Sequence, residues 1–138
     1  MNVLVIDGQG GGAGKLLVAK TKSLFPHLTV MAVGTNSVAA SSMLKAGADH
    51  SATGENSVVV CCGKADVIIG PLGIVVADSL FGEITPKMAL AVAQAKAVRI
   101  LLPFNTCDNI VAGVTDYSIG KLVGMAMEEL GKIVEKGS

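Results

Sequence analysis

The sequence has little charge and few aromatic residues, and these shortages argue against nucleic-acid binding. Lysine and arginine together number 11, and aspartate and glutamate also number 11, so the formal net charge is zero. A nucleic-acid-binding domain normally presents a basic patch, and domains that bind single strands add stacking aromatic rings. This chain has no basic run, and its aromatic residues are only Phe25, Phe81, Phe104 and Tyr117. We therefore expect no nucleic-acid partner.

A long apolar run and a basic leader are also missing. No stretch approaches the ~18 consecutive apolar residues of a membrane-spanning helix. The opening Met1-Asn2-Val3 enters a strand pattern directly, without a basic segment or a small-residue cleavage site. These absences predict a cytoplasmic protein with no membrane partner.

Cysteine is scarce, and its spacing does not suggest a metal or disulfide site. The chain has three cysteines, of which Cys61 and Cys62 are adjacent and Cys107 stands alone. No Cys-x-x-Cys pair occurs, so neither a disulfide framework nor a zinc site is indicated. We interpret the cysteines as buried structural thiols and expect no metal site.

What the chain has in excess is apolar surface. Hydrophobic residues make up 51% of its 138 positions, and glycine occupies 17 more. Charged residues make up 16%, against about 25% in a typical globular protein. The length is that of one domain, which we place at 1–138. So little charge leaves apolar surface uncovered on a monomer, and this predicts a homo-oligomer.

Apolar runs alternate with helical patterns, which predicts a mostly parallel sheet covered on both faces. One segment is ambiguous, because Val58-Val59-Val60 favours a strand while its place between Gly54 and the next strand favours a helix; we interpret it as helix. The expected strands are 3–6, 28–33, 67–69, 98–102 and 110–114, and the expected helices are 14–25, 36–47, 56–64, 74–81, 86–95 and 118–135.

The last expected strand, 110–114, follows the one before it after only seven residues. A parallel crossover generally needs about a dozen residues or more, so this strand is predicted to be antiparallel. The fold class is therefore a three-layer α/β/α Rossmann-like sandwich with an antiparallel last strand. In the terminal helix, Gly120, Gly124 and Gly131 fall along one stripe, which we expect to pack against the sheet or a partner subunit.

The most informative motif follows the first strand. It places five glycines within seven residues, and three of its positions fit the G-x-G-x-x-G/A pattern of dinucleotide-binding folds. Glycine allows a tight turn and lets a phosphate approach backbone N–H groups at the start of a helix. We expect these N–H groups to converge on the phosphate of a nucleotide, with the aspartate bracing the loop. The residues are Asp7, Gly8, Gln9, Gly10, Gly11, Gly12, Ala13 and Gly14.

Two further turns are expected to complete the site. In dinucleotide-binding folds an acidic residue about 20 positions after the glycine motif binds the ribose, and this chain has none there. Thr35 and Asn36 stand at the end of the second strand instead and are candidates for ribose binding. The turn that begins with Gly70 and Pro71 leaves the same edge of the sheet and could form the far wall of the cleft; an ordinary strand-end turn explains it equally well.

No catalytic residue can be named from the sequence. The loop also resembles a P-loop, but Leu16 stands where that motif needs a hydroxyl, and Lys15 is expected in solvent. Nothing places a histidine near Cys107. Two histidines are expected in solvent. Three carboxylates could converge near the cleft, but they show no metal-ligand spacing, and solvent exposure is the favoured interpretation for them as well. They are His27, His50, Asp78, Glu83 and Asp108.

These residues favour a nucleotide- or dinucleotide-binding protein whose ligand is NAD(P) or another nucleotide. Two alternatives stay open: a small NAD(P)-dependent oxidoreductase, and a structural, oligomer-forming protein without a ligand. The nucleotide itself, any reaction and any substrate are left unassigned by the sequence.

Five segments of the chain carry a family resemblance: residues 1–14, Gly34-Thr35-Asn36, 45–49, 53–56 and 70–73. Through them the sequence resembles an uncharacterised family of small Rossmann-like bacterial proteins over most of its length. The resemblance implies the fold and a cytoplasmic location, suggests that the quoted loops form one site, and assigns no substrate. The start also resembles nicotinamide-dependent reductases, but Tyr117 and Lys121 match their Tyr-x-x-x-Lys pair only in spacing, which we attribute to chance.

Overall fold

Residues 1–104 and 108–137, which the computed structural model describes, contain a five-stranded sheet in the order β3-β2-β1-β4-β5. Every neighbouring pair of strands is parallel. The long parallel sheet agrees with the expected α/β class and places all carboxyl ends of the strands at one edge. The strands are β1 (Asn2–Asp7), β2 (Thr29–Gly34), β3 (His50–Thr53), β4 (Val67–Pro71) and β5 (Val98–Leu102).

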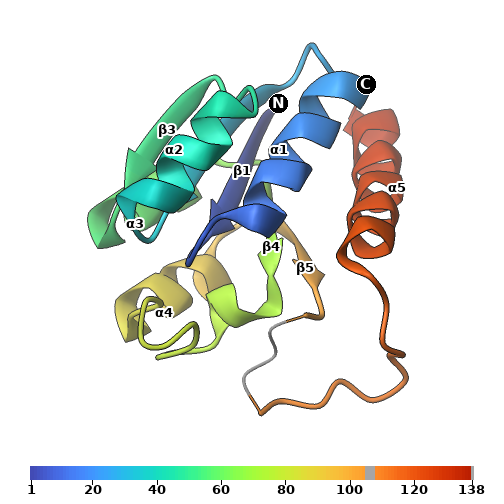
Figure 1. The fold of residues 1–138 in the computed structure, drawn as a ribbon. Helices are drawn as coiled ribbons and strands as arrows, with labels where there is room; N and C mark the ends of the chain where they lie inside the picture. Colours follow the sequence, from blue (N-terminus) through green and yellow to red (C-terminus); the bar gives the residue numbers. More distant parts are fainter. Residues whose placement is uncertain (105–107, 138) are drawn as a thin grey trace.

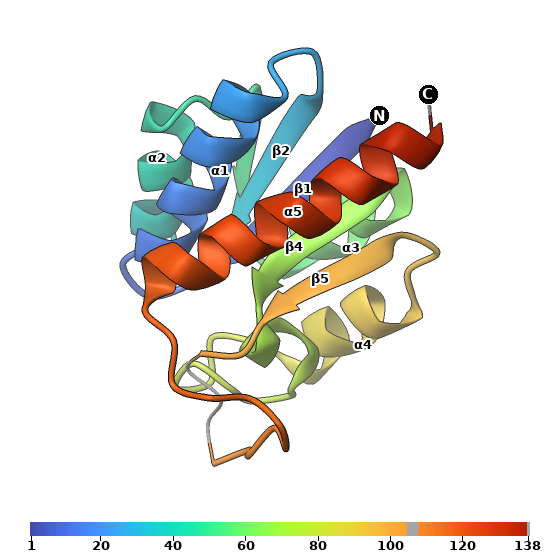
Figure 2. The ribbon, with the colours of Figure 1, turned by 90° about the vertical axis from the view of Figure 1, so that its right-hand side faces the viewer.

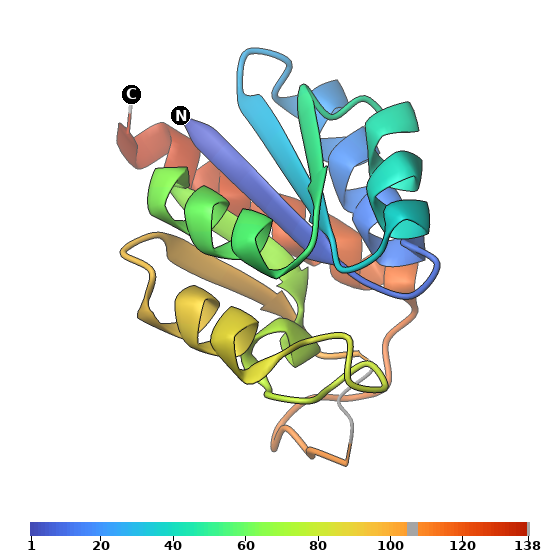
Figure 3. The same ribbon diagram turned by 90° about the vertical axis from the view of Figure 1, so that its left-hand side faces the viewer.

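Helices cover both faces of the sheet. Three helices, α1, α2 and α5, lie on one face, which Figure 2 presents to the viewer, and α3 and α4 lie on the other, which Figure 3 presents. Figure 1 views the sheet between the two layers. The helices are α1 (Gly12–Leu24), α2 (Ser37–Lys45), α3 (Glu55–Lys64), α4 (Pro86–Gln94) and α5 (Ile119–Gly137), with a short 3-10 helix, η1 (Leu72–Val75).

The apolar run of β1 supplies both cores. Val3 and Val5 pack beneath α1 and α5, whereas Leu4 and Ile6 point to the opposite face, toward α3 and α4. Successive side chains of a strand point to opposite faces, so a strand buried on both sides must be apolar throughout. All four side chains are completely buried, which explains why the run contains no polar residue.

The expectation of an antiparallel last strand is wrong. The last strand is β5, and it runs parallel to β4. Residues 110–114 form no strand; the segment lies exposed between β5 and α5, and Ile110 is 96% exposed. The physical reason is that α4, the helix before β5, packs on one face of the sheet, whereas α5, the helix after it, packs on the other face. The chain after β5 therefore serves as the connection that changes face.

The helix at 56–64 and the helix-capping residues were predicted more accurately than the last strand. The helix expected at 56–64 is α3, and Thr85 caps α4 by accepting the N–H of Met88 at 3.2 Å. Ser118 likewise accepts the N–H of Lys121 at 3.3 Å where α5 begins. The helix expected at 74–81 is wrong: only η1 forms there, and a series of turns follows it as far as α4.

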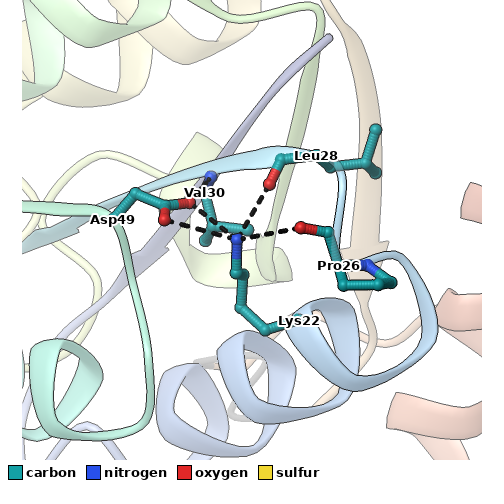
Figure 4. Close-up of polar contacts among 5 residues, drawn as sticks. All are labelled: Lys22, Pro26, Leu28, Val30 and Asp49. Atoms are coloured by element: carbon teal, nitrogen blue, oxygen red, sulfur yellow. Dashed lines mark hydrogen bonds and ion pairs between the residues drawn. The ribbon is translucent and has the colours of Figure 1, made fainter.

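A charged contact fastens α1 to the amino-terminal side of the sheet (Figure 4). The ammonium of Lys22 lies 3.0 Å from an Asp49 carboxylate oxygen and donates to the carbonyl of Leu28, also at 3.0 Å. Asp49 accepts the N–H of Val30 at 2.8 Å, so one carboxylate joins the end of α1 to β2. The N–H of Val30 and the Lys22 ammonium lower the pKa of Asp49.

Two of the three cysteines lie on α3. Cys62 is buried, and burial raises the pKa of its thiol to about 11; Cys61 is partly buried. These are the properties of structural thiols. The third, Cys107, lies outside the described residues. Within the described ranges, no group of three His, Cys, Asp or Glu side chains could hold a metal, and no helix is long and apolar enough to cross a membrane.

Candidate functional site

Asp7 ends β1 and closes the glycine loop onto the start of α1. Its side chain is 5% exposed, and its two carboxylate oxygens accept the N–H groups of Gly8 at 2.8 Å and Gly14 at 2.7 Å. Burial raises the pKa of Asp7; the two N–H groups oppose that rise, and the charge of Glu83 adds to it. Asp7 thus braces the loop, because both carboxylate oxygens are turned toward backbone N–H groups rather than outward.

Glu83 joins the glycine loop to the end of β2. Its Oε1 accepts the N–H of Gln9 at 2.9 Å, the hydroxyl of Thr35 at 2.5 Å and the side-chain amide of Asn36 at 2.8 Å. Three residues expected in the site are thus brought together by a carboxylate that the sequence analysis placed in solvent. Glu83 comes from the turns before α4, which lie below the carboxyl ends of the strands in Figure 3.

The ionisation of Glu83 follows from these contacts. Its partial burial opposes ionisation, but the donors on Thr35, Gln9 and Asn36 outweigh this effect and lower the pKa of Glu83. Asn36 has a second function, since its side-chain oxygen accepts the N–H of Ala39 at 2.9 Å and caps α2. The end of β2, the start of α2 and the glycine loop are therefore held as one unit around an ionised carboxylate.

Three glycines of the loop are required by packing. A Cβ atom on Gly8 would lie 2.7 Å from the Thr35 hydroxyl oxygen, and one on Gly14 would lie 2.6 Å from the sulfur of Met43. Gly11 has a positive φ of 74°, and its Cβ would lie 2.8 Å from the Cα of Ala39. These contacts let α1 and α2 approach the loop closely, which is the structural role that a glycine can have without any ligand.

Gly10 and Gly12 have no such role. A Cβ atom on either would meet nothing within 4 Å, and both residues are exposed. Neither has a φ in the positive range that disfavours other residues. Nothing in the packing of the described chain therefore requires glycine at these two positions.

The backbone N–H groups of the loop divide into two sets. Those of Gly8 and Gly14 donate to Asp7 and that of Gln9 to Glu83, while the N–H of Gly11 donates to the Gly8 carbonyl at 2.9 Å. The loop therefore cannot direct all its N–H groups at one ligand, contrary to expectation. Of the loop residues 8–14, which all lie within the described part of the chain, only Gly10, Gly12 and Ala13 have N–H groups without a hydrogen-bond partner.

A hollow lies beside the unpaired part of the loop. It has a volume of about 570 Å³ and extends from Gly10 along the outer side of α2. Three serines and one lysine are among its lining residues. Besides Gly10, the lining residues are Ser37, Val38, Ser41, Ser42 and Lys45.

Gly70 and Pro71 do not line this hollow. Both are buried in β4, and a Cβ atom on Gly70 would lie 2.5 Å from the carbonyl oxygen of Ile6. Glycine is therefore needed here because β1 and β4 approach closely. Leu80, which is 2% exposed, packs over the neighbouring Gly8. Of the two explanations left open by the sequence, the geometry favours the ordinary strand-end turn.

Several polar side chains outside the site are exposed or have contacts of their own. Lys15 is exposed, as expected, and so are His27 and His50. Tyr117 and Lys121 lie at the start of α5, where the lysine ammonium sits 4.8 Å from the centre of the tyrosine ring. This cation–π contact gives the pair a local structural explanation.

The sheet order and the two helical layers define a Rossmann-like α/β protein, with its glycine loop at the carboxyl edge beside the point where the strand order reverses. Within that class, the chain belongs to a family described as a domain of unknown function, DUF3842, which matches residues 2–135. The resemblance inferred from the sequence motifs is thereby confirmed.

Comparison with other known proteins finds similar chains among solved structures but no curated relative. No curated protein matches the chain. One similar crystal structure is that of a dodecameric FMN-dependent Ubix-like decarboxylase from Escherichia coli O157:H7. It is 17% identical, with a TM-score of 0.48, and the match covers 95% of this chain and 76% of that one.

Proposed function

We propose that this protein binds a nucleotide whose phosphate lies against the N–H groups of Gly10, Gly12 and Ala13. These groups stand at the beginning of α1, where the partial positive charge of a helix end favours an anion. Asp7 and Glu83 hold the remainder of the loop in place, so the free N–H groups are fixed in position before a ligand arrives. Such fixed donors reduce the entropic cost of binding.

One observation carries the proposal: the two glycines that the fold does not require, Gly10 and Gly12, are also two of the three loop residues whose N–H groups are unpaired. Packing accounts for Gly8, Gly11 and Gly14 but leaves Gly10 and Gly12 unexplained. A phosphate that approaches the backbone accounts for both, because a side chain at either position would occupy the space on the ligand side.

The hollow beside Gly10 suits the rest of such a ligand. Its volume of about 570 Å³ falls within the ~300–1,000 Å³ typical of small-molecule sites. Val38, which is 65% exposed, offers an apolar surface to a base, and the Lys45 ammonium offers a countercharge to a second phosphate. NAD(P) and other nucleotides share this phosphate chemistry, so the experiment must choose among them.

The test is thermal unfolding in the presence of inorganic pyrophosphate, ADP, NAD⁺, NADP⁺ and FMN. A ligand at about 100 times its dissociation constant stabilises a protein by about 2.7 kcal/mol. We expect pyrophosphate and at least one nucleotide to raise the unfolding temperature of the wild-type protein. Failure of every probe to do so would refute the proposal.

Gly10→Val is the matching variant. It should fold normally, since its side chain enters open space, but should lose the shift because the valine blocks the phosphate. Gly63→Val is the control: it adds the same side chain to open space on α3, on the other face of the sheet. A Gly10→Val protein that keeps the wild-type shift would place the ligand elsewhere.

A further inference from the structure

We infer that Glu83 is the residue that binds the ribose hydroxyls of the nucleotide, and hence that the ligand carries free 2′- and 3′-hydroxyls. This inference rests on the proposed function. All three donors that hold Glu83 converge on Oε1. Within residues 1–104 and 108–137, the other oxygen, Oε2, has no hydrogen-bond partner, so the side chain is fixed by one oxygen and has the other to offer.

The location of Glu83 is that of the missing ribose-binding acid. In dinucleotide-binding Rossmann folds an acidic residue at the end of the second strand binds the ribose. In this protein Thr35 and Asn36 stand where β2 ends, and neither is acidic. Both bind Glu83, which lies 48 and 47 residues further along the sequence. A distant segment thus delivers a carboxylate to a place where the local sequence supplies none.

The chemistry of Glu83 suits a diol. Its lowered pKa keeps it ionised at neutral pH, and an ionised carboxylate only accepts hydrogen bonds. Ribose hydroxyls can donate to it, whereas a 2′-phosphate would be repelled by its charge. Glu83 binds the N–H of Gln9, and the next residue, Gly10, lines the hollow and has a free N–H. The hydroxyl acceptor and the phosphate donors are therefore neighbours along the loop.

A different role for Glu83 makes the opposite prediction. The carboxylate could occupy the position of the phosphate itself, so that a ligand must displace it from Gln9, Thr35 and Asn36. Removing the carboxylate would then strengthen the binding of any phosphate compound, with or without ribose hydroxyls. The unpaired N–H groups of Gly10, Gly12 and Ala13 favour the first role, since they offer a phosphate site that Glu83 leaves empty.

The experiment compares Glu83→Gln with wild type by calorimetric titration with three probes: ADP, 2′,3′-dideoxy-ADP and inorganic pyrophosphate. Glutamine keeps an oxygen for the three donors but replaces Oε2 with an NH₂ group, which cannot accept from a hydroxyl. Glu55→Gln is the matched control, because Glu55 also accepts a threonine hydroxyl, that of Thr85 at 2.6 Å, outside the proposed site. Thermal unfolding checks that all three proteins are folded.

We expect wild type and Glu55→Gln to bind ADP at least about tenfold more tightly than dideoxy-ADP, as a hydrogen bond to a charged group allows. In Glu83→Gln this ratio should fall to about one, while pyrophosphate binds no more weakly than to wild type. An equal ratio in Glu83→Gln and wild type, or a wild-type ratio near one, would overturn the inference while pyrophosphate binding kept the proposed function intact. If wild type bound neither pyrophosphate nor ADP, both the inference about Glu83 and the proposed function would be overturned.

Discussion

The carboxylate of Glu83 lies 2.9 Å from the backbone nitrogen of Gln9, although 74 residues separate the two in sequence. This bond links the turns before α4 to the loop after β1, across the carboxyl edge of the sheet. Leu80, from the same turns, packs over Gly8. The shape of the glycine loop therefore depends on a segment from the second half of the chain, and on the folding of β4 that precedes it.

Replacement of Glu83 by alanine should destabilise the fold. The N–H of Gln9 and the side chains of Thr35 and Asn36 would lose their common acceptor. A buried or partly buried donor left without a partner costs about 1–3 kcal/mol, so we expect a loss in that range. Urea unfolding measures it. Glu83→Gln, which keeps an acceptor oxygen, should lose less; equal stability of Glu83→Ala and wild type would contradict this account.

Alanine at two adjacent glycines should have very different effects on stability. Gly11→Ala forces a residue with a Cβ into a φ of 74° and brings that Cβ to 2.8 Å from the Cα of Ala39. Strained backbone and overpacking together should cost about 2–4 kcal/mol. Gly10→Ala meets nothing and should change the unfolding free energy by less than about 0.5 kcal/mol. Similar losses in both variants would show that Gly10 is also needed for packing.

The strands that could be predicted are those with a continuous apolar run; β1, β2 and β4 are buried on both faces, whereas β5 is an edge strand in which only Leu102 is fully buried. The expected strands at 3–6, 28–33, 67–69 and 98–102 all exist, because a covered parallel sheet demands apolar runs. Strand β3, with the sequence His-Ser-Ala-Thr, escaped detection because it lies at the edge of the sheet and none of its residues is fully buried. The run at 110–114 misled because it is apolar without being buried.

The site was predictable only where its contacts are local. Asp7 and Gly8 are adjacent, and the bracing role of Asp7 follows from its place at the end of a strand before a glycine loop. The role of Glu83 could not be read from its neighbours in sequence, since its partners lie in the segments that follow β1 and β2. In the turns that carry it, Asp78, Leu80 and Phe81 have positive φ. Non-glycine residues rarely adopt this conformation, so their sequence does not predict it.

The contact between Lys22 and Asp49 predicts a dependence of stability on pH. The folded state lowers the pKa of Asp49 below its model-compound value of 3.8. The stability that its ionisation contributes is therefore fully present above about pH 5 and is lost as the pH falls through the folded-state pKa. Asp49→Asn should cost about 1 kcal/mol at neutral pH, because the carboxylate is 38% exposed and partly screened.

Urea unfolding of wild type and Asp49→Asn between pH 7 and pH 2.5 measures this effect. The difference between the two proteins should stay constant down to about pH 5 and shrink below pH 4. Glu129→Gln is the control, since Glu129 pairs with Lys132 on the exposed surface of α5 and should contribute less than about 0.5 kcal/mol. If the stability difference between wild type and Asp49→Asn grew on acidification, the predicted direction of the pKa shift of Asp49 would be wrong.

The sheet edge at β5 predicts self-association, which the composition also favours. β5 is the terminal strand of the sheet, and an apolar hollow of about 250 Å³ lies between it and α5, with Ile100, Tyr117 and Met125 in its lining. An unpaired, apolar edge strand can pair with the same strand of a second copy, and a chain of zero net charge offers no long-range repulsion. A Cβ on Gly124 of α5 would meet open space, so the glycine stripe does not pack against the sheet there.

Light scattering on the eluting protein at micromolar concentration should therefore give the mass of a dimer or a larger assembly. Met125→Lys should lower that mass, because it places a charge in the hollow where the second copy would lie. Leu90→Lys adds the same charge at an apolar residue that is 54% exposed on α4, on the other face, and should leave the mass unchanged. A monomeric wild type, or equal masses for the two variants, would rule out β5 as the interface, since the charge at residue 125 would then have met only solvent.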